Sequence, residues 1–243
     1  MSLLSLAFLT TAAFAIATTP TQCNIHVKLP AAPTSNITDT QKQLSLLFSN
    51  PSDQALDFTS VNDPHVTLFL TTFTDINSPD FISAAEVSLK QAYATSCAPT
   101  TYINIAISQY ASGSYGMLDV GLTTCLQALS DSLVTATSKY VDPSAKEYIP
   151  DWVYQLPPEE QKAKIDLISQ YGSPNVLSGF SPHVTLLADD VNTTELAGIM
   201  AANTVPEVEG LVTLVGFGNV GSFGSVLKGQ DLLPPLDVTA DEK

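Results

Sequence analysis

The stretch DPHVTLFL, residues 63–70, recurs in nearly the same form as SPHVTLLA, residues 181–188. Both copies contain the pentapeptide Pro-His-Val-Thr-Leu, and together they hold two of the three histidines in the chain. A pentapeptide that occurs twice in one chain indicates an internal duplication, in which each copy supplies an equivalent segment of the fold.

A second motif recurs in the same order along the chain. GSYG, residues 113–116, is matched by GSFG, residues 221–224. Each lies between two apolar runs, and its glycine and serine content is typical of a β-hairpin turn. The repeat unit is therefore longer than the pentapeptide, and its two copies differ in loop length.

Apolar residues at helical spacing predict helices over 39–48, 78–96, 123–140, 158–171 and 192–204. Asp39 is the expected N-cap of the first helix. Alternation of apolar and polar residues predicts strands at residues 23–30, at both copies of the repeated His-containing stretch and on either side of both hairpin turns. Each half is thus predicted to contain a strand with a histidine, a helix and a hairpin.

This order predicts an α+β fold, in which two lobes of a duplicated domain each form an antiparallel sheet with outer helices around a central cleft. We place the domain at residues 23–228. Within it, the first lobe covers about 23–140, a proline-rich connection covers 141–180, and the lobe of the second motif covers 181–228. The tail 229–243 is predicted to be irregular.

The chemistry of the repeat follows from strand geometry. Side chains alternate between faces with period two, so His65 and Thr67 share one face, and His183 and Thr185 share the equivalent face. If the lobes face each other, two imidazoles and two hydroxyls converge. One neutral imidazole can take a proton from water while the other, as imidazolium, gives a proton to a leaving oxygen. Which histidine is the base stays open.

Two H-x-T motifs, one in each half, resemble those of the 2H phosphoesterase superfamily, which includes RNA 2',3'-cyclic phosphodiesterases and plant cyclic phosphodiesterases. The lead-in YGSPNVLSGFSPHVTLL, residues 171–187, is also similar to the segment before the second motif in several members. The resemblance covers residues 23–228. It implies a two-lobed α+β fold with the catalytic residues His65, Thr67, His183 and Thr185 between the lobes.

The resemblance implies a phosphodiesterase that acts on a cyclic phosphate, such as a nucleoside 2',3'-cyclic phosphate, or on a short 2'-5' or 3'-5' linkage. Paired histidines need no metal and no cofactor for this chemistry. The alternative is a secreted, non-catalytic binding module on the same duplicated fold. Intact histidine and threonine in both copies favour the enzyme, because a binding module does not need two proton-transfer groups.

The residues that would bind substrate are less constrained. Many members of the superfamily hold phosphate with a basic residue near the second motif, but here Ser181 occupies the lead-in and the chain has no arginine. Lys28, on the same strand face as His26, is the best basic substitute. Tyr115 and Phe223 follow the glycines of the two hairpin turns and can stack on a base. Hairpin packing is the alternative for both aromatic residues.

The formal net charge of −15 limits the partners. Proteins that bind long nucleic acids neutralise several phosphates with clustered lysine or arginine, and this chain has no such cluster. We therefore expect a small nucleotide or cyclic phosphate as substrate, no long nucleic acid as partner, and a monomer.

The amino-terminal residues combine an apolar run with the small-residue pattern Ala13-Phe14-Ala15, which is typical of a secretory signal peptide over residues 1–17. A buried core helix is the alternative. No later stretch is predicted to span a membrane. The protein is therefore expected to be secreted and extracellular.

Three cysteines occur at Cys23, Cys97 and Cys125, an odd number that suggests one disulfide and one free thiol. Cys97 ends one predicted helix and Cys125 begins the next, with no zinc-binding spacing at any cysteine. Because the intervening hairpin brings its two ends together, we predict a disulfide between Cys97 and Cys125.

Overall fold

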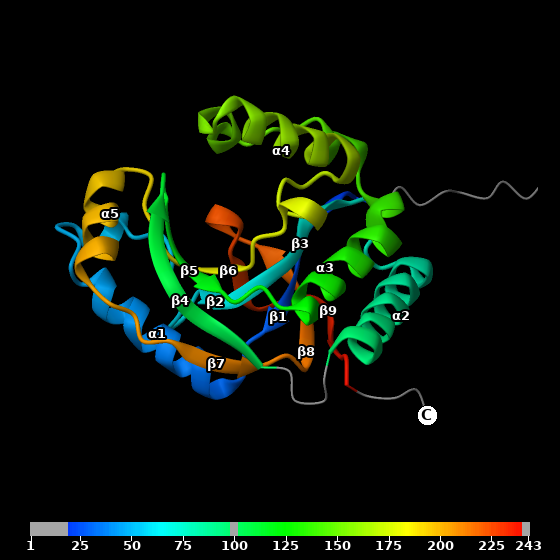
Figure 1. The fold of residues 1–243 in the computed structure, drawn as a ribbon, viewed down its shortest axis with the longest axis horizontal. Coiled ribbons are helices and arrows are strands. Elements are labelled where there is room, and N and C mark those ends of the chain that lie inside the picture. Colours follow the sequence, from blue (N-terminus) through cyan, green and yellow to red (C-terminus); the bar gives the residue numbers. More distant parts are fainter. Residues whose placement is uncertain (1–18, 98–101, 240–243) are drawn as a thin grey trace, which may run out of the picture.

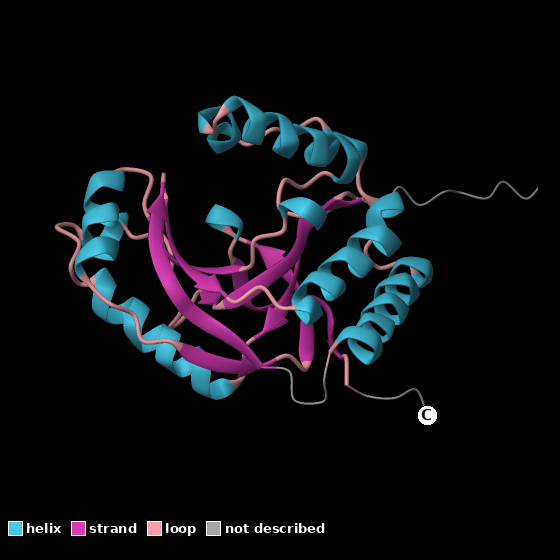
Figure 2. Cartoon of the chain, viewed as in Figure 1, coloured by secondary structure: helices cyan, strands magenta, loops and turns pink. Residues whose placement is uncertain are grey.

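The computed structural model describes residues 19–97 and 102–239. Two curved antiparallel sheets, with helices on their outer sides, form a two-lobed α+β fold (Figures 1 and 2). The fold class predicted from the sequence is confirmed. The predicted signal peptide, residues 1–17, lies outside the described residues. Within the part of the chain that the structure describes, no helix is both long enough and apolar enough to cross a bilayer.

One sheet contains the strand of the first motif, and we call it the first-motif sheet. Its strand order is β2-β9-β8-β1-β3, and every neighbouring pair is antiparallel. Its strands are β1 (Thr21–Lys28), β2 (Asn62–Asp63), β3 (His65–Phe73), β8 (Leu214–Val220) and β9 (Val226–Asp237).

The other sheet, the second-motif sheet, contains the strand of the second motif. Its order is β6-β5-β4-β7, again antiparallel throughout. Its strands are β4 (Tyr102–Ser112), β5 (Tyr115–Val120), β6 (His183–Ala188) and β7 (Val208–Leu211).

The two hairpins are exchanged between the halves of the chain. The β4–β5 hairpin comes from the first half but pairs with β6, whereas the β8–β9 hairpin comes from the second half and pairs with β1. The two sheets therefore do not coincide with the predicted sequence ranges 23–140 and 181–228. The physical reason is that β1 has two open edges: β3 satisfies the hydrogen-bonding groups of one, and β8 those of the other.

The predicted irregular tail, 229–243, is also wrong over most of its length, because β9 continues to Asp237. Pro234 and Pro235 suggested a break. They fall where the pairing register with β8 shifts, between the pairs formed by Leu233 and Leu236, so no ladder hydrogen bond is lost at either proline.

The helices lie on the outer sides of the sheets. Helices α1 (Ala31–Ser45) and α5 (Thr193–Ala202) cover the second-motif sheet, and α2 (Pro79–Ser96) and α3 (Thr124–Thr137) pack together beside the first-motif sheet (Figure 1). Helix α4 (Pro158–Tyr171) belongs to the connection between the halves. Short 3-10 turns occur at Pro51–Asp53, Ser138–Tyr140, Pro143–Lys146, Asp151–Gln155, Leu177–Gly179 and Ser222–Gly224.

Local signals set most helix ends. Ser78 caps α2 by accepting a hydrogen bond from the backbone N–H of Phe81, and α4 ends at Gly172, whose φ of 69° is left-handed. The predicted start of α1 at Asp39 is wrong, because the helix begins at Ala31. Pro33 lies in its first turn, where a proline costs no intrahelical hydrogen bond.

A disulfide joins Cys97, at the C-cap of α2, to Cys125, in the first turn of α3, with the Cα atoms 4.7 Å apart. The pairing predicted from the sequence is present. The third cysteine, Cys23, is free and fully buried in β1.

Candidate active site

Both copies of the repeated pentapeptide lie where the two sheets meet. Strand β3 forms one edge of the first-motif sheet, β6 forms one edge of the second-motif sheet, and these two edge strands are in contact. We call this region the sheet junction. The valine and leucine of each motif are buried, whereas the histidine and threonine are partly exposed on the opposite face. The motif site comprises His65, Thr67, His183 and Thr185.

A β-bulge follows the threonine in both copies. The β1–β3 register passes from Thr67 to Phe69, and the β5–β6 register passes from Thr185 to Leu187. The extra residue reverses the alternation of side chains, so two consecutive apolar residues point into the core and the polar face ends at the threonine. The duplication therefore extends to an irregularity of the backbone. Its signal in the sequence was the pair of apolar residues that follows each threonine.

Backbone carbonyls hold the two motif histidines in the same orientation. Nδ1 of His65 lies 2.8 Å from the carbonyl oxygen of Asp63, and Nδ1 of His183 lies 2.8 Å from that of Ser181. Since a carbonyl only accepts hydrogen bonds, Nδ1 carries the hydrogen in both rings. In the neutral state each ring therefore presents the lone pair of Nε2 for proton transfer.

Asn24, a residue that the sequence reasoning missed, connects the parts of the first motif. It is fully buried on β1, and its Nδ2 lies 3.1 Å from His65 Nε2, 3.0 Å from Thr67 Oγ1 and 3.0 Å from the carbonyl oxygen of Gly224. The Gly224 carbonyl requires a donor, which fixes the orientation of the amide. The available signal was a polar residue two positions before His26 on the same strand.

The third histidine, His26, also belongs to this region. Its ring packs edge-on against His65 with the centroids 5.2 Å apart, and its Nδ1 lies 2.9 Å from the carbonyl oxygen of Asn24. The ring fits because Gly216 faces it from β8: a Cβ there would lie 2.6 Å from His26 Nε2. Burial, followed by the charge of His65, lowers the pKa of His26 to about 3.

The two motif histidines differ electrostatically. Burial and the charge of His183 together lower the pKa of His65 to about 4, against the opposing effect of the hydrogen bond to Asp63. Burial also lowers the pKa of His183, but the carboxylate of Asp119 raises it and the ammonium of Lys164 lowers it. A neighbouring carboxylate thus acts on the second motif histidine.

The predicted basic residue, Lys28, lies opposite His65 in the β1–β3 pairing, but its ammonium is 3.1 Å from a carboxylate oxygen of Asp231 on β9. Lys164 of α4, which the sequence reasoning missed, is the cation whose charge reaches His183. Its half-buried ammonium donates to Asn175 Oδ1 at 2.8 Å and to the Gly179 carbonyl at 3.1 Å.

The remaining predicted binding residues fall into two groups. Ser181 is exposed, and it contributes the backbone carbonyl that orients His183. Tyr115 and Phe223 contact each other edge to face, with ring centroids 5.7 Å apart, so the aromatic residues of the two recurring glycine motifs meet across the sheets. The turn that carries Phe223 is left-handed at that residue, with φ of 59°, and its next residue, Gly224, is tied to Asn24.

No protein-family model matches the chain, and no curated protein sequence matches it either. Among solved structures, it is similar to E. coli LigT in a complex with NADP+, with a TM-score of 0.48 and 13% identity over 91% of this chain and 100% of that chain. It is also similar to TT0787 of Thermus thermophilus, with a TM-score of 0.48, 14% identity and the same coverage. At identities this low, the similarity carries no information about function.

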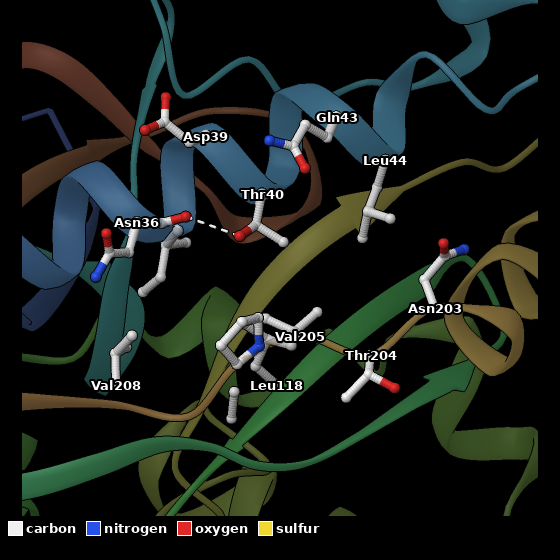
Figure 3. Close-up of a pocket in the computed structure, with 13 residues that line it drawn as sticks. Asn36, Asp39, Thr40, Gln43, Leu44, Leu118, Asn203, Thr204, Val205 and Val208 are labelled. Atoms are coloured by element: carbon white, nitrogen blue, oxygen red, sulfur yellow. Dashed lines mark hydrogen bonds between the residues drawn. The ribbon is translucent and has the colours of Figure 1, made fainter.

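A separate groove of about 520 Å³ lies between α1, β4 and the segment that follows α5 (Figure 3). Leu118 of β5 lines it, whereas the next residue, Asp119, is paired with His183. Since neighbouring residues of a strand point to opposite faces, the groove and the motif site lie on opposite faces of the second-motif sheet. The groove is therefore no part of the motif site.

His26 and His65, whose pKa values are lowered in the fold, predict a loss of stability in mild acid. The folded-state pKa of His26 is about 3 and that of His65 about 4, whereas a histidine in the unfolded chain titrates near 6.5. Between pH 6.5 and pH 4 the unfolded chain therefore binds more protons than the folded chain. For each of these two histidines, a fall of one pH unit in this range lowers the free energy of unfolding by up to about 1.4 kcal/mol. Their stabilising effect is complete above pH 6.5.

Urea unfolding of the wild type and of His26→Gln at pH 7, 6 and 5 tests this expectation. Removing one buried imidazole should make the loss of stability with falling pH shallower by up to about 1.4 kcal/mol per pH unit. Equal slopes for the two proteins would show that His26 is not held neutral by the fold.

Proposed function

We propose that this protein is a phosphodiesterase of the 2H phosphoesterase superfamily that hydrolyses a cyclic phosphate, such as a nucleoside 2',3'-cyclic phosphate, or a short 2'-5' or 3'-5' linkage. The observation that carries the proposal is the meeting of two equivalent His-x-Thr strands at the sheet junction. Both histidines have Nδ1 held by a carbonyl, so Nε2 is the nitrogen left for proton transfer, and that of His65 lies 3.1 Å from the amide nitrogen of Asn24.

The arrangement suits in-line attack of water on phosphorus. One histidine takes a proton from the attacking water, and the other gives a proton to the leaving oxygen, so both proton transfers are supplied by side chains. The hydroxyls of Thr67 and Thr185 are placed beside their histidines to donate to the non-bridging oxygens as negative charge develops. Proton exchange with solvent returns both histidines to their starting states.

The surroundings favour a small substrate. The chain has a formal net charge of −15, and the cation whose charge reaches His183 is Lys164. One ammonium and two hydroxyls are enough for a single phosphate but not for a polyanionic strand. The partly exposed Tyr115 and Phe223 rings supply a surface on which one base can stack.

A base-stacking role for these rings predicts a selective effect on KM. Stacking contributes about 1–3 kcal/mol per base, so Tyr115→Ala should raise KM for nucleoside 2',3'-cyclic phosphates by about 5- to 150-fold with little change in kcat. Glycerol 1,2-cyclic phosphate, which has no base, is the matched control and should show no such increase. An equal rise in KM for both substrates would assign the tyrosine a structural role instead.

Hydrolysis of the four nucleoside 2',3'-cyclic phosphates and of short 2'-5' oligomers, in the presence of EDTA, tests the proposed function directly. Release of a nucleoside monophosphate from at least one cyclic substrate is the expected result. Binding of these compounds without turnover would favour the alternative, a non-catalytic module on the same duplicated fold.

We further propose that the protein is secreted, after removal of residues 1–17. The disulfide between Cys97 and Cys125 supports this, because such bonds persist in oxidising compartments and are rare in the cytosol. Amino-terminal sequencing of the protein from the culture medium of an expressing host would test it.

A further inference from the structure

The two copies of the motif share a backbone but have different polar neighbours. An amide, Asn24, donates towards the first histidine, whereas a carboxylate, Asp119, stands directly opposite the second in the β5–β6 pairing. In a duplicated site, the positions at which the copies differ are those that can give the two histidines different tasks.

The neighbours of His65 favour its neutral form. Lys28 and His26 face it from β1 and His183 faces it from β6, and the Lys28 charge is paired with Asp231. Among the described residues, no carboxylate forms an ion pair or hydrogen bond with its ring. The Asn24 N–H aimed at Nε2 stabilises the lone pair there, because an imidazolium would place one N–H against another.

The Asn24 amide also allows the ring to accept a proton during the reaction. Nδ2 has two hydrogens and three neighbours, and the Gly224 carbonyl takes one of the hydrogens. The other is shared between His65 Nε2 and Thr67 Oγ1. When His65 takes a proton from water, the shared amide hydrogen of Asn24 can turn away from Nε2 and donate to Thr67 Oγ1. The hydroxyl hydrogen of Thr67 is then free to donate to the phosphate.

His183, unlike His65, has a carboxylate beside its ring, which favours its charged form against the burial that lowers its pKa. Directly opposed residues of an antiparallel pair project from the same face, so the Asp119 carboxylate lies beside the His183 ring. Ser108 of β4 donates a hydrogen bond to this carboxylate and thereby holds it in place. The charges that oppose the imidazolium form of His183 are those of Lys164 from α4 and His65 from β3. Tyr110 of β4 lies near the Asp119 carboxylate.

We propose that Asn24 and Asp119 are positioning residues that make the two histidines unequal, so that His65 is the base that activates water and His183 is the acid that protonates the leaving oxygen. This inference rests on the proposed function. In the hydrolytic step, a proton of the attacking water passes to His65 Nε2 as the water oxygen bonds to phosphorus. The bond from phosphorus to the leaving oxygen breaks, and that oxygen takes the proton from His183 Nε2.

Leaving-group chemistry tests the division of roles. A nucleoside 2',3'-cyclic phosphate releases an alkoxide that needs a proton, whereas thymidine 5'-(4-nitrophenyl phosphate) releases a nitrophenolate that does not. His183→Ala should lose about 10²–10⁴-fold in kcat/KM on the cyclic substrate but less than about tenfold on the nitrophenyl ester. His65→Ala should lose about 10²–10⁴-fold on both.

The reverse pattern, in which His65→Ala is the variant spared on the nitrophenyl ester, would overturn the division of roles and leave the proposed function standing. A wild type that hydrolyses neither substrate would instead overturn the proposed function itself. The two failures are therefore distinguishable.

The positioning roles are tested by pH profiles of kcat/KM on the cyclic substrate. Asn24→Asp, which is nearly isosteric, should raise the pKa of His65 and move the acid limb to higher pH by about one unit. Asp119→Asn should lower the pKa of His183 and move the alkaline limb to lower pH by about one unit. Asp80→Asn, an exposed residue of α2, is the control and should leave both limbs in place. If the Asn24 and Asp119 variants lose rate but neither limb of the pH profile moves, these two residues have only a structural role.

Discussion

Replacing either motif histidine with alanine is expected to lower kcat/KM for the cyclic substrate by about 10²–10⁴-fold, the contribution of a positioned general acid or base. The two losses should not add in the double variant His65→Ala/His183→Ala, because base and acid act in one transition state as a unit. The check is to measure initial rates of cyclic phosphate hydrolysis in EDTA, at several pH values, for the two single variants and the double variant.

The threonines supply the matched controls. Thr185→Ser keeps the hydroxyl and should retain most activity, whereas Thr185→Val keeps the shape and should lose about 10²–10³-fold in kcat, as expected for the removal of one donor to a developing oxyanion. Urea unfolding of each variant checks that the fold is intact. If both histidine variants match the wild type in rate, the enzyme assignment is wrong.

The motif site was largely predictable from the sequence because its information is local. An identical pentapeptide in two places indicates duplication, and period-two alternation places His65 with Thr67 and His183 with Thr185. Those inferences need no knowledge of which strands pair. The same is true of the disulfide, whose two cysteines lie at adjacent helix ends on either side of a hairpin.

The pairing of distant strands was not predictable in this way. A hairpin turn shows that its own strands pair, but the outer edges of β4–β5 and β8–β9 carry no signal for the partner beyond them. Lys28 is paired with Asp231 because β9 runs beside β8, where Asp231 lies opposite Gly218. Asn24 likewise appeared as one polar residue of an alternating strand, until pairing on both sides buried it against His65.

Removing the disulfide is expected to cause the largest loss of stability among the changes considered. The bond between Cys97 and Cys125 closes a loop with a sequence separation of 28 residues, and a loop of this length restricts the unfolded chain enough to stabilise the fold by about 3–4 kcal/mol. The double variant Cys97→Ser/Cys125→Ser should therefore unfold at a clearly lower urea concentration than the wild type. Unfolding of the wild type in reducing agent should match that variant.

Cys23→Ala is the control that separates the disulfide from thiol content. Its side chain is fully buried, and burial raises the pKa of the thiol, so it should react with thiol reagents only after unfolding. Reducing agent should therefore shift the unfolding midpoint of Cys23→Ala as much as that of the wild type, and should not shift that of the double serine variant. Because the disulfide ties α2 to α3 on the outer side of the first-motif sheet, kcat of the folded double variant should stay close to that of the wild type. Equal midpoints for the oxidised wild type and the double variant would show that the bond does not stabilise the fold.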